Sequence, residues 1–338
     1  MTPTSRLKNL AGELRLFGVL LLLMLILSLI SDRFLTVDNL TNVLWSVCLI
    51  GIMSTGAIYA PVTGGIDLSV GSMAALAGII ANVLMNGFGL HWVLALVVTL
   101  GFGVLIGWVN GIVTTRFLVP AFIVTMAAKT YLFGLAMLIS NGDQITIMQP
   151  QPFLAIGVGK LFGIPIPIYL MAALAILSHV LLKHTVFGRQ AIAVGANEVA
   201  ARLSGVNPDR TRIYVYILSA LTATVAGIVM ASLTQQAYAM NASGYELDVI
   251  TAIVVGGTSL MGGNGSVLGA LIGAIMVGFI NNGLNLLDMP SAFHPIATGC
   301  VILLALILNH GVSLPKLFRK WAARPQPAEV SLGGDRSG

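Results

Sequence analysis

Ten apolar stretches, most of them long enough to cross a lipid bilayer as a helix, dominate this chain. With 57% hydrophobic and 9% charged residues, the chain is far from the roughly 25% charged residues of a soluble domain. We therefore predict an all-α polytopic membrane protein with about ten transmembrane helices. The stretches lie near residues 16–31, 40–62, 67–86, 92–115, 119–140, 165–182, 212–234, 247–258, 264–286 and 293–310.

The first and the eighth stretches need separate treatment. Basic residues precede the first, as in a signal peptide, but no small-residue cleavage pattern follows it, so we expect a retained transmembrane helix. The eighth is short, and Gly256-Gly257 ends it. Either it is a half-helix buried in protein, or its start lies earlier in the chain.

Lysine and arginine residues divide unequally between alternate loops. With the N-terminus in the cytoplasm, 14 of the 17 basic residues fall on the cytoplasmic side, as the positive-inside rule requires. We therefore expect both termini in the cytoplasm and an even number of spans. Residues 1–15 then form a cytoplasmic tail, residues 16–310 the transmembrane domain, and residues 311–338 a disordered cytoplasmic tail.

The sequence favours neither an enzyme nor a nucleic-acid-binding protein. Cys48 and Cys300 both lie inside apolar stretches, so we expect no disulfide, no metal site and no cofactor. The five histidines are scattered near the ends of the stretches without metal-binding spacing, and we assign no catalytic residue. A Gly-x-x-x-x-Gly-Lys-Ser/Thr phosphate loop is missing from the sequence, so any ATP hydrolysis must come from another chain. The basic residues are not clustered as a nucleic-acid footprint would be.

Glycines recur at every fourth position in two of the stretches. In a bilayer, small residues allow helix backbones to approach closely, and this contact supplies packing energy. The pattern predicts packing within the bundle, with a dimer interface as the alternative. The glycines are Gly103, Gly107 and Gly111, and then Gly265, Gly269 and Gly273.

Two glycine-rich breaks share the spacing Gly-Gly-x-x-Leu-x-x-Gly, at residues 64–71 and 256–263. Unwound backbone at membrane depth is tolerated only against protein or a water-filled path, so these breaks are candidates for a translocation path. The alternative is two tight cytoplasmic turns in which Asp67 or Ser259 caps the next helix. On the outer side, the polar segment 235–248 is either a gate or an ordinary external loop. The candidate path residues are Gly64, Gly65, Asp67, Ser69, Gly256, Gly257 and Asn281.

The loop at 183–212, between the sixth and seventh stretches, contains the signals of a short ordered helix. Asn197 suits the N-cap, Glu198 the first turn, and Gly205 the position after the end. Glu198 and Arg202 can pair at i, i+4. A helix this short is marginal alone and needs a partner surface. The residues leave two alternatives open: a solvated connector, or a docking element.

The loop resembles the coupling segment of ribose-type ABC importer permeases. The match comprises Phe187-Gly188-Arg189, then Ala193-Val194-Gly195-Ala196-Asn197, and then Ala200-Ala201-Arg202-Leu203-Ser204-Gly205. The chain departs from the family at Ala196, where a second glycine is usual, and we expect some strain in the turn. The two glycine breaks and Val119-Pro120-Ala121-Phe122-Ile123-Val124-Thr125 also match family motifs. The similarity spans about residues 16–310.

The resemblance implies a permease subunit of a monosaccharide importer in the bacterial inner membrane, with a fold similar to that of the cobalamin importer's ten-helix subunit. It implies three protein partners: a cytoplasmic ATPase, an extracytoplasmic sugar-binding protein, and a second permease, either a copy of this chain or a paralogue. The residues implied to couple to the ATPase are Gly188, Arg189, Gly195, Asn197, Glu198, Ala200, Ala201, Arg202 and Gly205.

Two rival functions remain for comparison. An ion-coupled secondary transporter usually places carboxylates or histidines in the middle of the membrane, whereas the acidic residues here fall near the ends of the stretches. An intramembrane enzyme would need a catalytic constellation that the sequence does not show.

Overall fold

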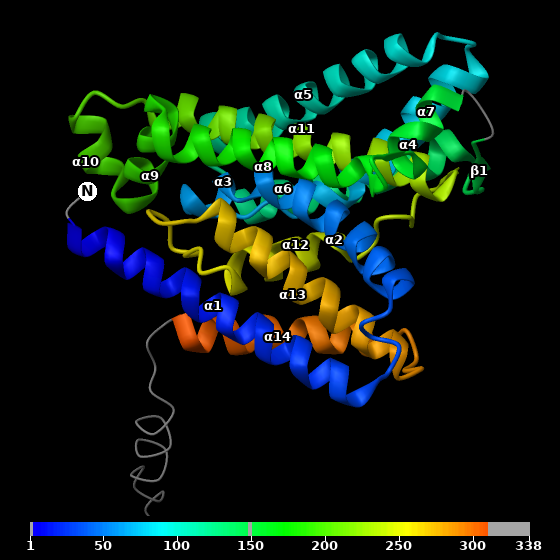
Figure 1. Ribbon diagram of the computed structural model, residues 1–338. Coiled ribbons are helices and arrows are strands. Elements are labelled where there is room, and N and C mark those ends of the chain that lie inside the picture. Colours follow the sequence, from blue (N-terminus) through cyan, green and yellow to red (C-terminus); the bar gives the residue numbers. More distant parts are fainter. Residues whose placement is uncertain (1–2, 148–150, 310–338) are drawn as a thin grey trace, which may run out of the picture.

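The computed structural model describes residues 3–147 and 151–309, and it is a bundle of helices with two very short two-stranded sheets (Figure 1). In the first half of the chain the elements are α1 (Pro3–Ile30), α2 (Val37–Ala57), α3 (Tyr59–Val62), α4 (Val70–Asn82), the π-helical turn η1 (Val83–Gly87), α5 (Trp92–Arg116), α6 (Ala121–Ser140) and β1 (Ile145–Thr146). They are followed by α7 (Gln151–Val158), β2 (Lys160–Leu161), β3 (Ile164–Pro165), α8 (Ile166–His184), α9 (Val186–Ala196), α10 (Glu198–Leu203), α11 (Pro208–Thr234), β4 (Gln236–Ala237), α12 (Tyr245–Val255), α13 (Val267–Leu286) and α14 (Phe293–Asn309).

Seven helical segments in the described part of the chain are long and apolar enough to cross a membrane. Shorter apolar helices at Leu16–Ile30 and Phe293–Ala305 correspond to the first and last predicted stretches. These findings confirm an all-α polytopic membrane protein. The seven segments are Val37–Val62, Val70–Gly87, Trp92–Arg116, Ala121–Ser140, Ile166–His184, Pro208–Thr234 and Val267–Leu286.

The eighth predicted stretch is the exception in length. It forms α12, a helix of 11 residues that ends at Val255, directly before Gly256. At 1.5 Å per residue, such a helix is about 16 Å long, roughly half the 30 Å hydrocarbon core of a bilayer. Of the two alternatives, the structure supports the half-helix, since most of α12 is buried against its neighbours and lies in the middle of the bundle (Figure 1).

Helix α11 lies at the centre of the bundle and packs against α2, α4 and α5. Glycines make these contacts possible: a Cβ at Gly107 would lie 2.5 Å from the Tyr216 carbonyl oxygen, and one at Gly227 would lie 2.0 Å from the Ala74 carbonyl oxygen. In the second series, a Cβ at Gly273 would lie 2.0 Å from the Ala252 carbonyl oxygen. Both predicted glycine series therefore serve packing within the bundle, as expected.

Apolar side chains cover much of the outside of the bundle. In α5, α6 and α8 only about a quarter of each apolar segment is buried, whereas most of the segments that contain α2 and α11 is buried. Such a large exposed apolar surface is unfavourable in water and suits lipid. α2, α4 and α11 thus form the core, and α5, α6 and α8 form much of the shell.

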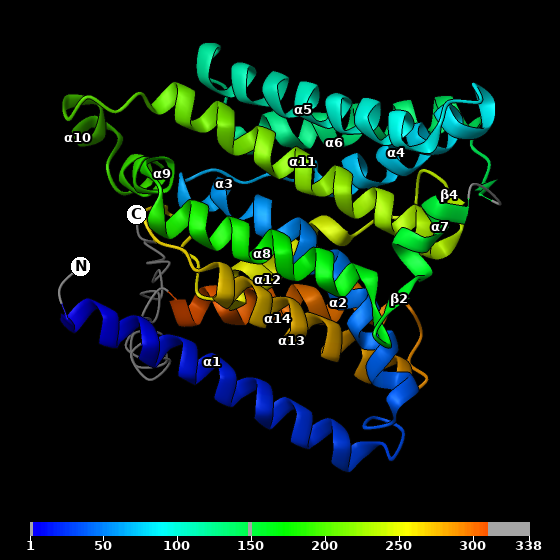
Figure 2. The same cartoon turned by 45° about the horizontal axis from the view of Figure 1, so that its top comes forward.

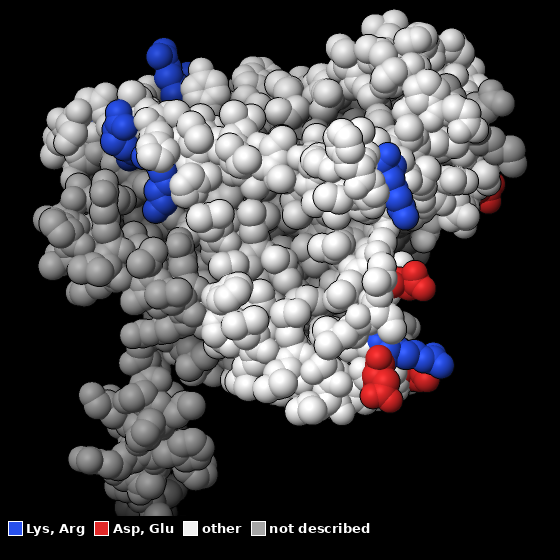
Figure 3. Space-filling view, viewed as in Figure 1, with Lys and Arg blue, Asp and Glu red and all other residues white. Residues whose placement is uncertain are grey.

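The two ends of the bundle differ. α9 and α10 lie at the end where α1 begins and α14 ends, and α7 with the short strands lies at the opposite end (Figure 2). On the face shown in Figure 3, Lys and Arg side chains lie at both ends of the bundle, whereas Asp and Glu side chains lie only at the end opposite α9 and α10. At that second end β1 pairs with β4, and β2 pairs with β3, both antiparallel.

Candidate functional site

The loop between α8 and α11 folds into two short helices, α9 and α10. α9 begins after Thr185, whose hydroxyl accepts a hydrogen bond from the Gly188 amide at 3.2 Å. Gly188 has no room for a side chain, because a Cβ there would lie 2.1 Å from the Leu182 carbonyl oxygen. The neighbouring Arg189 is exposed. The first helix of the loop was not predicted, since two glycines within it lower its helix propensity.

α10 is the helix that the sequence predicted. The side chain of Asn197 caps it by accepting a hydrogen bond from the Ala200 amide at 2.9 Å. Ala201 is buried and Ala200 is exposed. After the helix, Gly205 adopts φ +83°, a left-handed conformation that favours glycine. The N-cap and the terminal glycine are therefore confirmed.

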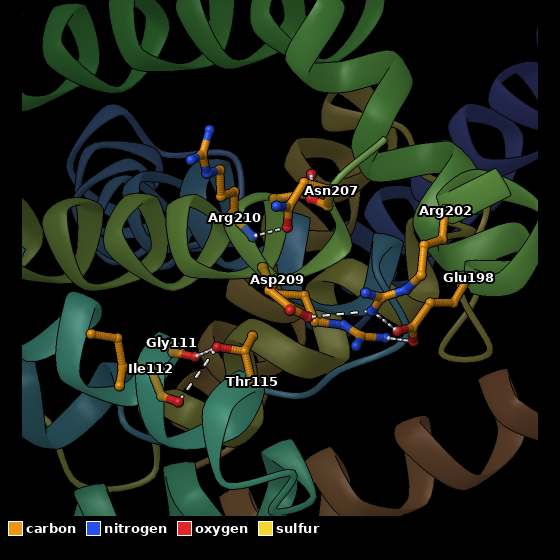
Figure 4. A network of polar contacts seen from close by, with 10 residues as sticks. Gly111, Ile112, Thr115, Glu198, Arg202, Asn207, Asp209 and Arg210 are labelled. Atoms are coloured by element: carbon orange, nitrogen blue, oxygen red, sulfur yellow. Dashed lines mark hydrogen bonds and ion pairs between the residues drawn. The ribbon is translucent and has the colours of Figure 1, made fainter. Parts of the chain in front are cut away.

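Ion pairs hold α10 against the start of α11 (Figure 4). The Glu198 carboxylate accepts hydrogen bonds from Arg202 at 3.3 Å and from Arg212 at 2.7 Å. Arg202 also lies 3.6 Å from Asp209. Partial burial raises the pKa of the Glu198 carboxyl, but the hydrogen bonds and charges of Arg212 and Arg202 outweigh it, so this pKa lies below its ordinary value. The predicted Glu198–Arg202 pair is confirmed, and Arg212 is an additional partner.

The outer surface of the loop is apolar as well as charged. Val199 is 70% exposed and Leu203 is 85% exposed, and the two residues lie at i, i+4 on one face of α10. Val186, at the start of α9, is also exposed.

Close backbone contacts join α9 to both glycine breaks. A Cβ at Gly195 would lie 1.9 Å from the Val62 carbonyl oxygen and 2.6 Å from the Gly263 nitrogen. The Gly263 amide donates a hydrogen bond to that same Val62 carbonyl at 2.9 Å. Gly262 and Gly263 both have positive φ. The end of α9, the end of α3 and the turn before α13 therefore meet at one junction of three backbone segments.

Ala196 lies at this junction without strain. It is the last residue of α9, it is exposed, and it is not among the residues with positive φ. An alanine therefore fits this position, and the strain expected at Ala196 is not present. The chain turns instead at Asn197, which has extended backbone with φ −163°.

The first glycine break leads from α3 into α4 through extended backbone. Gly64 adopts φ +79°, and a Cβ at Gly65 would lie 2.5 Å from the Tyr216 hydroxyl. Asp67 is buried, and its carboxylate accepts hydrogen bonds from the amide of Ser69 at 2.9 Å and from its hydroxyl at 2.6 Å. Ser69, not Asp67, occupies the N-cap position of α4, so the alternative in which Asp67 caps this helix is wrong.

The second break ends α12. Gly256 packs against Gly269 of α13, where a Cβ would lie 2.4 Å from the Gly269 carbonyl oxygen. Gly257 adopts φ +84° and is exposed. The hydroxyl of Ser266 caps α13 by accepting a hydrogen bond from the Gly269 amide, so Ser259 is not the cap either.

The candidate path residues do not form one cluster. Asn281 lies in α13 beside Asp248 of α12, whose carboxylate accepts a hydrogen bond from Thr298 at 3.0 Å. The buried turn of Asp67 and Ser69 instead borders α5, because Asn110 donates a hydrogen bond to the Ser69 hydroxyl at 3.4 Å. Gly256 and Gly257 lie at the far end of α12 from Asp248.

One intramembrane ion pair was missed. The Lys129 ammonium lies 2.6 Å from the Glu246 carboxylate, and Glu246 is only 3% exposed. Glu246 lies in the first turn of α12, near the end of its stretch as expected, but the sequence did not show that it is buried and paired with Lys129. Its signal in the sequence was the single lysine inside an apolar stretch, which requires a counter-charge when it is not at a helix end.

The comparisons with known proteins agree with these features. Ribose import permease protein RbsC of Haemophilus influenzae is 39% identical over 308 residues, which covers 90% of this chain and 95% of the relative. RbsC of Escherichia coli K12 is 39% identical over 294 residues, covering 86% of this chain and 91% of the relative. The L-arabinose transport system permease protein AraH of the same strain is 35% identical over 306 residues, with 88% and 89% covered.

No solved structure matches the chain. The family described as "Branched-chain amino acid transport system / permease component" matches residues 39–307, which is most of the chain. This match covers most of the chain, and the long apolar helices agree with it. The chain therefore belongs to this family of transport-system permease components.

Proposed function

We propose that this chain is the permease subunit of an ABC importer that carries a monosaccharide into the cytoplasm. The observation that carries the proposal is the loop of α9 and α10, a capped and ion-paired element with an apolar outer face. The names of the relatives support a sugar as the substrate, either a ribose-like pentose, a hexose or a related small polyol. The chain itself is a transport subunit and not an enzyme.

The ATPase of such an importer is expected to dock on this loop. Val199 and Leu203 offer apolar contact area, and Arg189 adds a charge on the same end of the bundle. Gly195 connects the loop by direct backbone contact to α3 and to the turn before α13. A push on α9 is therefore transmitted to both glycine breaks. The expected coupling residues and the two other partners, a sugar-binding protein and a second permease, belong to this proposal.

The proposal also includes the membrane topology. The excess of basic residues at the α9–α10 end supports its placement in the cytoplasm together with both termini. The segment from Gln235 to Gly263 then crosses as β4, a series of turns and the half-helix α12, which brings the number of crossings to ten. This arrangement of a broken helix inside a bundle favours a fold similar to that of the cobalamin importer's subunit.

Leu203→Asp tests the docking surface. The change places a charge on the exposed apolar face of α10 without touching a hydrogen bond of the loop. In proteoliposomes with the ATPase and the binding protein, we expect uptake of labelled ribose to fall about tenfold or more, because a buried interface does not tolerate an unpaired charge. The matched control is Phe162→Asp, 92% exposed at the opposite end of the bundle, which should retain uptake.

The same uptake assay shows which solute is carried and whether ATP or an ion gradient drives the uptake. Arabinose, glucose and leucine are compared with ribose in the wild-type complex. An ion-coupled transporter is the second candidate, because a charged pair such as Lys129–Glu246 inside the membrane is typical of ion pathways. Uptake that persists without ATP and collapses with an ionophore, or uptake of leucine alone, would contradict the proposed sugar importer.

A further inference from the structure

A hollow of about 160 Å³ opens beside the ion pair of Lys129 and Glu246. Polar side chains and the first turn of α4 contribute to its wall. Besides the ion pair, the wall includes Gly71, Ser72, Thr130 and Ser243. Thr130 and Ser243 are exposed, so the hollow is open on one side.

The hollow lies at membrane depth. Lys129 is the ninth residue of α6, a helix of 20 residues, and Glu246 is in the first turn of the half-helix α12. The side chain of Lys129 is 42% exposed, whereas that of Glu246 is 4% exposed. A charged side chain in contact with hydrocarbon at this depth costs several kcal/mol. Lys129 lines the hollow, and water in the hollow would avoid this cost.

The wall is shaped around the carboxylate. A Cβ at Gly71 would lie 2.4 Å from Oε2 of Glu246 and 2.8 Å from the Ala242 carbonyl oxygen. The missing side chain lets the first turn of α4 approach the carboxylate. α4 and α12 both begin here, so the ends of two broken spans meet at the ion pair.

The chemistry of the pair selects a class of solute. The ammonium donates up to three hydrogen bonds and one of them goes to Glu246, while the carboxylate can accept several. The pair as a whole has no net charge, so it requires no ionic solute to balance it. A neutral solute with adjacent hydroxyl groups can donate to the carboxylate and accept from the ammonium at the same time.

We infer that the hollow between α4, α6 and α12 is a transient binding site for the hydroxyl groups of the translocated sugar, with Lys129 as donor and Glu246 as acceptor. This inference rests on the proposed function and adds a place on the path to it. The site is separate from the coupling loop, which lies at one end of the bundle.

The main variant is Lys129→Met combined with Glu246→Gln. It removes both charges together and leaves none unpaired, so the bundle should insert and assemble normally. At saturating sugar-loaded binding protein, we expect ribose uptake to fall about tenfold or more, the effect of losing one charge-assisted hydrogen bond. ATP hydrolysis and binding of the ATPase should stay at the wild-type level.

The exchanged variant, Lys129→Glu with Glu246→Lys, distinguishes a role of the pair in binding sugar from a role in holding α6 against α12. It keeps an ion pair between α6 and α12 but puts the ammonium where Gly71 leaves room for a carboxylate. We expect uptake to stay low. Full recovery of uptake in the exchanged variant would show that the pair only braces the helices, and would overturn the inference.

A direct measurement uses Thr130→Cys in a protein with Cys48→Ala and Cys300→Ser. We expect a charged thiol reagent to modify this cysteine and ribose to slow the reaction. The control is Phe162→Cys, 92% exposed in the turn between β2 and β3, whose reaction ribose should not change. An unreactive Thr130→Cys, or one that ribose does not protect, contradicts the site. If the wild-type complex takes up no sugar, the proposed function itself fails, whatever these variants do.

Discussion

At Gly195 the absence of a side chain lets three segments of the chain touch through their backbones. The carbonyl of Val62 and the amide of Gly263, which are hydrogen-bonded to each other, lie where a Cβ would be. Interiors packed this closely transmit displacement because their atoms have no free space to absorb it. The glycine therefore matters for the connection between α9 and the two glycine breaks.

Gly195→Ala should damage this connection. A Cβ 1.9 Å from the Val62 carbonyl oxygen forces backbone to move, at a cost of about 1–3 kcal/mol in unfolding free energy. We expect a lower midpoint of thermal unfolding in detergent, and sugar uptake reduced relative to ATP hydrolysis. The matched control is Gly134→Ala on α6, where nothing lies within 4 Å of the added Cβ. Equal stability and uptake in the two variants would show that the junction is not tightly packed.

Residues whose role is local were predicted well from the sequence. The Asn197 cap and the turn at Gly205 depend on neighbours a few positions away, so their spacing is informative. The Lys129–Glu246 pair joins residues 117 positions apart, and no local pattern specifies such a pairing. Asp67 shows the same limit. Its position before an apolar stretch suggested a helix cap, but α4 begins later than expected, and its N-cap is Ser69, two residues after Asp67.

Among the elements, α10 is the one whose stability depends most on its surroundings. Six residues are too few for a stable isolated helix. Glu198 at its start reaches Arg212 on α11, and the same carboxylate also pairs with Arg202 at the end of α10. The proposed docking surface is therefore held in place by a carboxylate that must be ionised.

Glu198→Gln should loosen α10 and remove a pH dependence. The pKa of Glu198 is lower in the folded protein than its ordinary value, so its contribution is complete above the ordinary range of a glutamate. The contribution is lost as the pH falls through the folded-state pKa. Intrinsic exchange slows on acidification, so the quantity to compare is the protection factor of the α10 amides. We expect it to fall on acidification in the wild type and to be low at all pH values in the variant.

A matched variant for this measurement is Asp209→Asn. Asp209 contacts only Arg202 within the network, at the longer distance of 3.6 Å, so its loss should leave most of the protection in place. Slow exchange in Glu198→Gln at neutral pH would mean that apolar packing alone anchors α10.

Elements were predictable to the extent that their length and apolar pattern were clear. The long spans were found because a bilayer imposes a minimum length on a helix. α9 was missed because glycines at 188 and 195 serve tight contacts there at the expense of helix propensity. α12 was left as two alternatives, since the sequence shows where a half-helix ends but not that the rest of the bundle buries its start.

Taken as a whole, the molecule is a shell of lipid-compatible helices around α11, with a charged loop at one end. α11 has 27 residues and is about 40 Å long, enough to reach from one membrane surface to the other. Its first residue follows the loop of α9 and α10, and its last lies next to β4 at the other end. α11 therefore places these two features at opposite ends of the bundle.

Three single cysteines test this topology in a protein with Cys48→Ala and Cys300→Ser. Leu203, Met261 and Phe162 are 85%, 75% and 92% exposed, so a cysteine at each should be accessible. An impermeant thiol reagent should modify Leu203→Cys and Met261→Cys only from the cytoplasmic face, because basic residues gather at that end. It should modify Phe162→Cys only from the outer face.

Met261 is the decisive position. If it is labelled from the same face as Leu203, the segment that contains α12 must cross the membrane, although α12 has only half the length of a spanning helix. Labelling of Met261→Cys from the outer face would mean that α12 enters and leaves on the same side, and the count of ten crossings would be wrong.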